Sequence, residues 1–495
     1  MNTHSKWRGT RAAAAILAAG LAVLTMAAPA HADNLVDPNE VGSLTIHKYE
    51  APETPTGLPN DGTEQTVALP PLAGVGFTVY KVDPIDLTTN AGWQDAADLA
   101  DVFDGTTGSI TGAGFTATAV GAEQLTDAAG EITLTGLDLG LYYVVETSPL
   151  AGSTAVAPFL VTVPLTDPNN LDAWLYDVHV YPKNALTEAT KTVEDSEDIK
   201  LGDEIEFTIT GDIPNVAIID GYKIADDLDP KLDYVSTSVT LSDGTALVAG
   251  THYTVTPAAA TTGGPLVEIT FTAAGLDLLE LHTDATVVAE ITTTVNTVGE
   301  IANTALLYPN AASFNAQPGE PGGPTETPEV ITKWGDLTIL KTDDAAAPLT
   351  GAVFSVYLTE ADAQAGTNAI VLGGATEFTT AADGTVTISG LRYSDWADGV
   401  AVAPGDPNYQ TYWLAEIVAP DGFELLAEPI EFTITAATTA VGVDLTVENV
   451  PSNAGFELPL TGGTGTTVFI AGGLLLLAGA VFLAVYTRRK NQVDA

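Results

Sequence analysis

The sequence predicts an all-β fold of three tandem β-sandwich domains, and three observations support this prediction. Hydrophobic residues alternate with polar ones in short runs that Gly, Pro, Asn and Asp separate, as in half-buried antiparallel strands. The chain has 495 residues, of which 45% are hydrophobic, so it is long enough for about three domains of ordinary size. Sustained helical periodicity is scarce, and only residues 93–103 and 359–366 are candidates for short helices or loops on one flank.

The first and last domains are expected to be copies of one module, because two distant regions of the chain repeat the same motifs. The paired segments are Gly42–Lys48 with Gly335–Lys341, Pro71–Tyr80 with Pro348–Tyr357, and Tyr142–Pro149 with Tyr412–Pro420. Such self-similarity indicates duplication of one structural unit.

The middle region lacks these repeated motifs, so it is predicted to be a different sandwich. Residues 205–209, 267–271 and 287–291 all alternate in hydrophobicity and are predicted to be strands. Residues 317–328 are rich in proline and are expected to form a loop before a last strand that ends near Thr332. The predicted divisions are 1–32 (signal peptide), 33–184 (first sandwich), 185–332 (middle sandwich), 333–452 (last sandwich) and 453–495 (sorting segment).

Composition narrows the classes of function. Acidic residues number 64 against 16 basic ones, and the net charge of −48 would repel nucleic-acid phosphates and anionic membrane surfaces. Cysteine is absent, which excludes disulfides, thiolate catalysis and thiol-ligated metals. The six histidines show no ligand spacing and no GxSxG or zinc motif occurs, so a secreted enzyme is disfavoured, and no metal or cofactor is expected. Acidic loops at 195–198 and 343–344 lack EF-hand spacing, and a solvated surface is favoured there over bound calcium.

The amino terminus has the features of a secretory signal peptide. Three basic residues precede an apolar run from Ala12 to Ala28, and Ala30-His31-Ala32 provides a small-x-small cleavage pattern. Cleavage is expected after Ala32. A membrane anchor is disfavoured because the apolar run is short for a bilayer span.

The carboxyl terminus combines a short motif, an apolar run and a basic tail. The motif is Leu458-Pro459-Leu460-Thr461-Gly462, a transmembrane helix is predicted over residues 466–486, and Arg488-Arg489-Lys490 would hold its end in the cytoplasm. This order resembles the LPxTG sorting signal of Gram-positive surface proteins. The resemblance implies that a sortase cysteine attacks the Thr461 carbonyl, releases the segment from Gly462 onward and passes the acyl group to an amine.

The stretch from Trp174 to Asn184 offers an amine that could accept this acyl group. Val178, Val180, Pro182 and Asn184 share one strand parity and are expected to face a core, whereas His179, Tyr181 and Lys183 are expected to face water. An exposed lysine is ordinarily a solvated charge. Lysine is scarce in this chain, however, with nine lysines and one arginine between Asp33 and Thr461, so Lys183 in a patterned position is a sharper signal.

The same parity rule directs three polar side chains into the interior of the last module. Lys341, Glu416 and Asn449 each share a strand face with apolar neighbours. Burial lowers the pKa of a lysine and raises that of a glutamate, by up to roughly 3–5 units, so the two can persist as neutral amine and neutral acid. A protonated Glu416 bonded to Asn449 would polarise the amide while Lys341 attacks and ammonia leaves. The alternative interpretation is a simple ion pair beside a hydrogen-bonded asparagine.

Taken together, these motifs resemble the major shaft pilins of Gram-positive, especially actinobacterial, fimbriae. Trp174–Lys183 is similar to their pilin motif, WxxxVxVYPK, and Tyr412–Phe423 is similar to their E-box. The last module resembles collagen-adhesin B-type domains, which contain Lys–Asn isopeptide bonds. The resemblance implies Ig-like sandwiches of B-, A- and B-type in that order, a Lys341–Asn449 bond, and a sortase-made bond from Thr461 of one subunit to Lys183 of the next.

In the middle domain, the resemblance to A-type modules implies a second internal bond. Lys191 and Asn303 would form it, with Asp226 in the catalytic role. Asp227 and Asn310 are the alternatives.

In the first domain, the matching set is Lys48, Glu146 and Asn184. Many family members lack a bond in this domain or form it only after polymerisation. The Lys48–Asn184 bond is therefore left open.

The resemblance also implies where the chain works and with what. It predicts a structural subunit that is not an enzyme, is exported through a transient membrane intermediate, and supports adhesion as part of a wall-anchored surface fimbria. The implied partners are other copies of the chain, pilin-specific and housekeeping sortases, peptidoglycan, and tip or minor pilins, with a host receptor left open. The alternative is a monomeric wall-anchored adhesin, which shares the sorting motif but needs no linking lysine.

Overall fold

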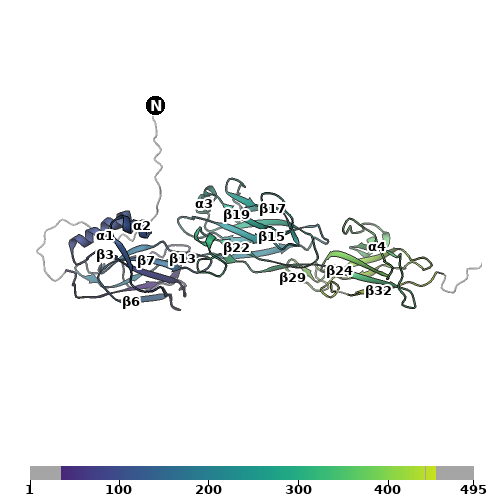
Figure 1. Cartoon of the computed structure of the whole chain (residues 1–495), viewed down its shortest axis with the longest axis horizontal. Coiled ribbons are helices and arrows are strands. Elements are labelled where there is room, and N and C mark those ends of the chain that lie inside the picture. Colours follow the sequence, from purple (N-terminus) through teal and green to yellow (C-terminus); the bar gives the residue numbers. More distant parts are fainter. Residues whose placement is uncertain (1–34, 441, 453–495) are drawn as a thin grey trace, which may run out of the picture. The chain divides into compact units, whose positions relative to one another are not determined.

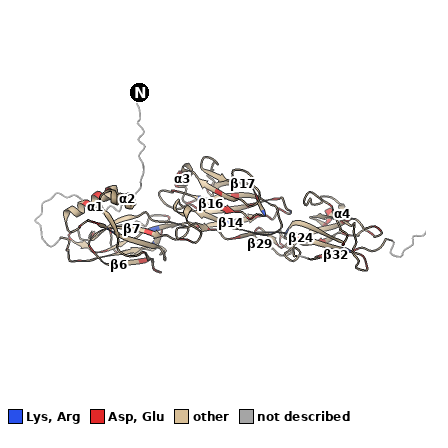
Figure 2. Ribbon diagram, in the orientation of Figure 1, with Lys and Arg blue, Asp and Glu red and all other residues tan. Residues whose placement is uncertain are grey.

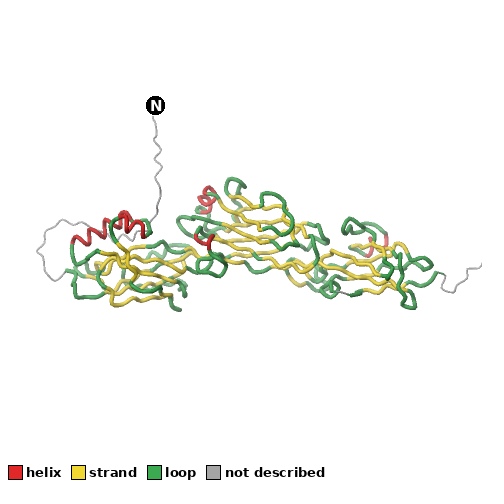
Figure 3. Tube along the Cα trace, viewed as in Figure 1, coloured by secondary structure: helices red, strands yellow, loops and turns green. Residues whose placement is uncertain are grey.

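The computed structural model describes residues 35–440 and 442–452. Their regular secondary structure is mostly strands (Figures 1 and 3), which confirms the all-β prediction. They form two compact units. The first unit comprises the chain up to Asp336 together with Ser389–Gln410 and Ile434–Thr439. The second comprises Leu337–Ile388, Thr411–Thr433 and the segment from Ala440. Within the described range no helix has the length and apolar character to cross a bilayer. The predicted signal peptide, transmembrane segment and sorting motif fall outside that range.

The first sandwich is built from two main sheets. Its elements are β1 (Gly42–His47), β2 (Tyr49–Glu50), β3 (Gly76–Asp83), α1 (Asn90–Val102), α2 (Thr107–Gly112), β4 (Thr116–Ala119), β5 (Gln124–Leu125), β6 (Glu131–Leu137), β7 (Gly140–Ser148), β8 (Ser153–Thr154), β9 (Phe159–Val163), β10 (Leu165–Thr166), β11 (Trp174–Leu175), β12 (Asp177–Val180) and β13 (Lys183–Leu186). One sheet has the order β12-β1-β6, and the other has the order β4-β3-β7-β9 with β5 beside β3. The shorter arrangements β10-β11 and β2-β13-β8 complete the domain.

Strand β7 shows how alternation builds two apolar layers in this sandwich. Tyr142 and Val144 belong to the buried cluster between the two sheets, whereas Leu141 and Tyr143 belong to a second cluster beneath α1 and α2 (Figure 1). Each helix begins at a threonine whose side chain accepts a backbone N–H, as N-caps do. The candidate helix at 93–103 is therefore α1, and α2 is an element that the periodicity did not indicate.

The stretch from Trp174 to Asn184, expected to be one strand, is divided into β11, β12 and β13. Pro182 has no backbone N–H, so the hydrogen-bond ladder is interrupted there. Strand β12 pairs in parallel with β1, and β13 pairs in parallel with β2 and antiparallel with β8. The alternation persists across the break: Val178, Val180, Pro182 and Asn184 are buried, and His179, Tyr181 and Lys183 are partly exposed.

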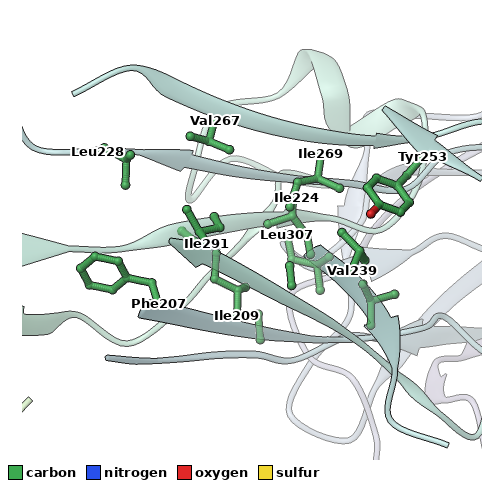
Figure 4. Close-up of a cluster of buried hydrophobic side chains, with 14 of the residues drawn as sticks. Phe207, Ile209, Ile224, Leu228, Val239, Tyr253, Val267, Ile269, Ile291 and Leu307 are labelled. Atoms are coloured by element: carbon green, nitrogen blue, oxygen red, sulfur yellow. The ribbon is translucent and has the colours of Figure 1, made fainter. Parts of the chain in front are cut away.

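The middle region is a second sandwich with a different topology. Its elements are β14 (Ala189–Glu194), β15 (Glu204–Asp212), β16 (Lys223–Asp227), β17 (Leu232–Leu241), β18 (Tyr253–Thr256), β19 (Leu266–Phe271), α3 (Ala273–Leu279), β20 (Thr286–Val295), β21 (Gly299–Asn303), β22 (Ala305–Tyr308), the 3-10 helix Ala312–Asn315 and β23 (Thr325–Glu326). The sheets have the orders β14-β15-β20-β17 and β18-β19-β16-β22-β23. Between them lies a continuous apolar core in which Phe207, Ile224 and Ile291 are completely buried (Figure 4).

The last module repeats the design of the first. Its elements are β24 (Val330–Thr342), β25 (Val353–Tyr357), α4 (Glu360–Ala365), β26 (Phe378–Thr379), β27 (Thr385–Arg392), β28 (Trp396–Ala397), β29 (Val400–Ala401), β30 (Tyr412–Val418), β31 (Ile430–Phe432) and β32 (Leu445–Glu448). Strand β24 pairs with β21, β27 and β32, and β26-β25-β30-β31 form the other main sheet. The candidate helix at 359–366 is α4, which begins after the cap Thr359 and ends at Gly366 with a φ of 66°. Strand β24 runs straight through the predicted boundary between 332 and 333.

Candidate cross-linking sites

Three buried polar side chains lie together in the last module. Lys341 lies on β24, Glu416 on β30, and Asn449 directly after β32. Their relative exposures are 0%, 6% and 2% in that order. The Asn449 amide donates hydrogen bonds to both Glu416 carboxylate oxygens at 2.9 Å. Lys341 Nζ donates to the Val447 carbonyl at 2.8 Å. Because Lys341 and Val447 are register partners on parallel strands, the amine and the Asn449 amide share one face of the sheet.

The environment of this site favours nucleophilic chemistry. Burial lowers the pKa of Lys341, which increases the fraction of the amine that is neutral at a given pH. Asn449 Oδ1 is a buried oxygen with no hydrogen-bond partner. An unsatisfied buried acceptor is costly, so this oxygen would gain a partner if a donor approached during reaction.

The first module brings together the equivalent residues Lys48, Glu146 and Asn184. Lys48 Nζ donates to Glu146 Oε2 at 2.8 Å and also contacts Asn184 Oδ1. Asn184 Nδ2 donates to Glu146 Oε1 at 2.5 Å, so each pair of the three side chains is in contact. Burial lowers the pKa of Lys48 to about 8, although the Glu146 carboxylate opposes the shift.

Two backbone features around these three side chains recur in both the first and the last module. The N–H of each lysine donates to a glycine carbonyl, Gly130 for Lys48 and Gly384 for Lys341, and these glycines have φ values of 78° and 77°. A Cβ added at Gly130 or Gly384 would lie only 2.4 or 2.7 Å from the lysine carbonyl oxygen. Glycine is thus required where the chain passes close to the backbone of each buried lysine.

The second recurring feature is a backbone N–H ten residues after each glutamate. Val156 N–H donates to Asn184 Oδ1 at 3.0 Å, with a longer contact of 3.4 Å to Glu146 Oε2. Leu426 N–H donates to Glu416 Oε2 at 3.0 Å. These donors were not found from the sequence, because no side-chain type marks a backbone N–H that turns inward. Their only signal is the similarity of Val156-Ala157-Pro158 to Leu426-Ala427-Glu428-Pro429.

The middle sandwich holds a third buried set, with aspartate in place of glutamate. Lys191 Nζ donates to Asp226 Oδ2 at 2.6 Å, and Asn303 Nδ2 approaches the same oxygen at 3.5 Å. Burial lowers the pKa of Lys191 to about 8 and raises the pKa of Asp226. The Lys191 ammonium also lies 5.0 Å from the centre of the Phe207 ring, so one side of the site is apolar.

The two alternatives for the middle site occupy other environments. Asp227 is exposed on the opposite face of β16. Asn310 donates to the Ser153 carbonyl at 3.1 Å and to the Thr154 hydroxyl at 3.2 Å. The structure therefore brings Asp226 and Asn303 to Lys191, and not these alternatives.

Lys183, the predicted linking residue, begins β13 and is partly exposed. Its Nζ donates to the carbonyl of Tyr181 at 3.1 Å, and partial burial lowers the pKa of the amine. Thr461, the predicted acyl donor, and the rest of Leu458–Gly462 lie outside the described residues. Blue segments, which mark Lys and Arg, are sparse along the ribbon in Figure 2, consistent with the scarcity of basic residues in the sequence.

Two groupings of ionisable residues were not anticipated. His47 and His179, treated as scattered in the sequence, are hydrogen-bonded to each other. Asp195, expected in a solvated acidic loop, is only 1% exposed and accepts hydrogen bonds from the Asp398 N–H and the Thr332 hydroxyl. The expectation of a solvated surface is wrong for Asp195, because its partners come from distant segments that local composition does not reveal. Among residues 35–440 and 442–452, no His, Asp and Glu side chains are grouped as a metal site would require.

Known proteins resemble the chain over almost its entire length. Residues 39–185 match the N-terminal domain of Gram-positive pilin subunits (D1), residues 335–449 match a prealbumin-like fold domain, and residues 450–493 match the LPXTG cell wall anchor motif. Fimbrial subunit type 1 of Actinomyces viscosus is 33% identical over 99% of each chain.

Two solved structures of major pilins from Corynebacterium diphtheriae have the same architecture. SpaD superposes with a TM-score of 0.66 and 28% identity, covering 85% of this chain and 99% of SpaD. SpaA superposes with a TM-score of 0.60 and 26% identity, covering 83% of this chain and 100% of SpaA. The SpaA structure points to a modular pilus assembly and stabilizing isopeptide bonds. The chain therefore belongs to the LPXTG-anchored major pilins of Gram-positive bacteria, which are structural subunits of wall-anchored surface fimbriae and not enzymes.

Proposed function

We propose that a sortase joins this subunit to its neighbour through the Thr461 carbonyl and Lys183 Nζ, and that internal Lys–Asn amide bonds brace the subunit. The observation that carries the first part is the position of Lys183. Lys183 is partly exposed at the start of β13, its amine is held by the Tyr181 carbonyl, and its lowered pKa increases the neutral, nucleophilic fraction. The next residue, Asn184, faces the core, so the acceptor lysine is fixed to a buried strand.

The intermolecular step exchanges one acyl bond for another. The neutral Lys183 amine attacks the thioester carbon formed by Thr461 and the sortase cysteine, the new C–N bond forms, and the C–S bond breaks. The sortase thiolate leaves, and the proton lost from the amine restores it to the thiol. A second attack by a peptidoglycan amine on the last subunit would anchor the fibre in the wall. Pilin-specific and housekeeping sortases are the proposed enzymes, with tip or minor pilins as further partners.

The internal bonds would form without an enzyme. A neutral lysine Nζ bonds to the side-chain carbonyl carbon of asparagine, the bond to the amide nitrogen breaks, and ammonia leaves. The neighbouring acid carries a proton from the attacking amine to the leaving nitrogen. The proposed pairs, with their acids, are Lys341–Asn449 with Glu416, Lys191–Asn303 with Asp226, and Lys48–Asn184 with Glu146. The direct contacts of Asp226, Glu146 and Glu416 with their asparagines support these assignments.

These bonds suit a fibre that transmits tension. Hydrogen-bonded strands separate under sustained force, because mechanical lifetime is set by the unfolding rate. Amide cross-links would carry the tension through covalent bonds instead of hydrogen-bonded strands. They need no cysteine, which the chain lacks. In this proposal the sandwiches divide at 184/185 and 332/333. The assembled fibre would support adhesion.

The polymerisation proposal is tested on cell-wall extracts run on denaturing gels after boiling. A ladder of covalent multimers is expected for the wild type, and a single species for Lys183→Ala. Lys81→Ala, which removes a partly exposed lysine paired with Asp138 in the same domain, is the matched control and should preserve the ladder. Multimers of normal length from Lys183→Ala would contradict the proposed linkage and favour another acceptor.

The internal bonds are tested by intact mass. Each bond lowers the mass of the mature chain by one ammonia relative to the mass calculated from its sequence. An unchanged mass would rule out self-linking while leaving the sortase linkage unaffected.

A further inference from the structure

Four ionisable side chains form a line across the sheet that carries the pilin motif. Glu131 Oε1 on β6 lies 3.1 Å from His47 Nδ1 on β1, and His47 Nε2 lies 2.8 Å from His179 Nδ1 on β12. His179 Nε2 in turn lies 3.4 Å from Asp177 Oδ2. The line thus contains a carboxylate at each end and two imidazoles in contact at its centre. It crosses all three strands of the sheet β12-β1-β6.

The central contact limits how many protons the line can hold. A hydrogen bond between two imidazole nitrogens needs one proton, so one nitrogen must donate and the other must accept. If both rings were protonated, two N–H groups would face each other at 2.8 Å and the bond would be lost. The pair therefore carries at most one positive charge while it remains intact.

This pair is connected to the acceptor lysine through one aromatic ring. The Tyr181 ring stacks on His47 with centroids 4.7 Å apart and planes inclined by 7°. The Tyr181 hydroxyl accepts the Gln65 N–H at 2.6 Å, which holds the other side of the ring. The backbone carbonyl of Tyr181 accepts the hydrogen bond from Lys183 Nζ at 3.1 Å. Displacing the His47 ring would remove the stacking support of the Tyr181 ring, and Tyr181 is the residue whose backbone carbonyl binds the amine.

We propose that His47 and His179 are positioning residues for acyl transfer to Lys183, and that loss of the His47–His179 hydrogen bond in acid loosens Tyr181 and lowers the reactivity of the amine. This inference rests on the proposed function of Lys183 as acceptor. Neither imidazole touches the reacting atoms. Their role is to fix the residue that binds the amine.

The direction of the pH effect follows from the surroundings of the pair. The charged and titratable groups that face it are Glu131, Asp177 and Glu64, with Tyr181 stacked on His47 and Tyr49 beside Glu131. Burial and the neighbouring His179 lower the pKa of His47, against the opposing effect of the carboxylates. A histidine whose pKa is lower in the folded state contributes stability that is complete above its ordinary value of about 6.5 and is lost as the pH falls. The His47–His179 hydrogen bond and the stacking of Tyr181 on His47 should therefore be intact at neutral pH and should be lost in acid.

The test measures the rate of acyl transfer to the mature chain as a function of pH. The chain carries Thr461→Ala so that it serves only as acceptor, and a labelled peptide containing Leu-Pro-Leu-Thr-Gly is the donor, with one pilin sortase throughout. Rates are compared between about pH 5 and 8 for the wild-type site, His47→Gln and His179→Gln. Glutamine keeps a donor and an acceptor but does not titrate, so these variants should fold, which thermal unfolding checks. His282→Gln, which removes a surface histidine paired with Asp243, is the control.

Each outcome bears on the proposal. Because the sortase and the lysine titrate in every sample, their contributions cancel in the ratio of wild-type to variant rates. That ratio should fall several-fold from neutral to acid pH for His47→Gln and His179→Gln, and should stay constant for His282→Gln. Tyr181→Leu, which removes the stacked ring, should be slow at all pH values. A constant ratio for both histidine variants overturns the inference, whereas transfer that persists in Lys183→Ala overturns the proposed function instead.

Discussion

The first and last modules have the same buried residue types on the same frame, yet their lysines contact different partners. In the first module, Lys48 Nζ binds the Glu146 carboxylate and contacts the Asn184 oxygen. In the last module, Lys341 Nζ binds the Val447 carbonyl, and Glu416 is bonded to Asn449 and to a backbone N–H instead. The two sites therefore share composition but differ in the atoms to which the amine is hydrogen-bonded.

The modules also differ in their proposed place along the path of tension. Force would enter a subunit at Lys183 and leave it at Thr461, so the chain before Lys183 carries none of it. In the last module, a Lys341–Asn449 bond would divert force past everything between those two residues. The difference teaches that the same cross-link would carry tension in one copy of the module and only restrain the fold in the other.

The largest effect is expected from Glu416→Gln in the last module. Glutamine keeps the shape and a hydrogen-bond acceptor but is not an acid, so the Lys341–Asn449 bond should not form. Losing a cross-link that closes a loop of about 100 residues should lower the free energy of unfolding by about 4–5 kcal/mol. Urea unfolding of the mature chain measures the loss, and the intact mass, compared with the mass calculated from each sequence, should show one ammonia fewer lost than in the wild type. Full cross-linking in this variant would show that Glu416 is not the promoting acid.

The next effect concerns the charge of Lys48. The pKa of Lys48 is about 8 in the folded chain against 10.5 for an ordinary lysine, so its contribution to stability is complete above 10.5 and is lost as the pH falls to about 8. In Asn184→Ala, which has no partner amide, stability should fall by about 3 kcal/mol over that range. The control is Lys48→Met with Asn184→Ala, which lacks the titrating amine. If the first module is cross-linked, the wild type should resemble this control, because an amide nitrogen does not titrate in this range.

Strand alternation predicts much of both sites from the sequence. Lys341, Glu416 and Asn449 were directed inward because each lies two residues from an apolar neighbour, and all three are buried. The same rule separates Lys183 from Asn184. The alternation of side chains depends only on local backbone geometry, so it can be predicted without knowledge of the tertiary fold.

Features that depend on distant segments could not be predicted in this way. His47 and His179 meet because β1 and β12 pair in parallel, and nothing local to either residue indicates that register. Asp195 is buried by partners from a segment about two hundred residues away, as the contact with Asp398 shows. Strand β24 continues through an expected boundary, because its two halves pair with β21 and β32, and alternation alone gives no signal of such a change of partner.

A smaller effect is expected from Gly384→Ala in the last module. The new Cβ would lie 2.7 Å from the Lys341 carbonyl oxygen at a φ of 77°, so strain and contact together should cost about 1–3 kcal/mol and displace the amine. Gly351→Ala is the matched control, since Gly351 has a φ of 86° but no atom within 4 Å of an added Cβ. Mass spectrometry should show incomplete cross-linking only in Gly384→Ala. Equal cross-linking in both would mean that the close approach at Gly384 does not position Lys341.

The smallest mechanical effect is expected from Glu146→Gln in the first module. This change should prevent the Lys48–Asn184 bond for the same reason that Glu416→Gln prevents its counterpart. Because tension would enter at Lys183 and pass directly to Asn184, the first module should stay unloaded, and fibres of this variant should extend no further under force than wild-type fibres. Pulling single fibres measures the extension, and Glu416→Gln fibres, in which the last module can unfold, supply the positive control. Extension of Glu146→Gln fibres by an additional folded module would show that force reaches the chain before Lys183 and that the subunits are joined elsewhere.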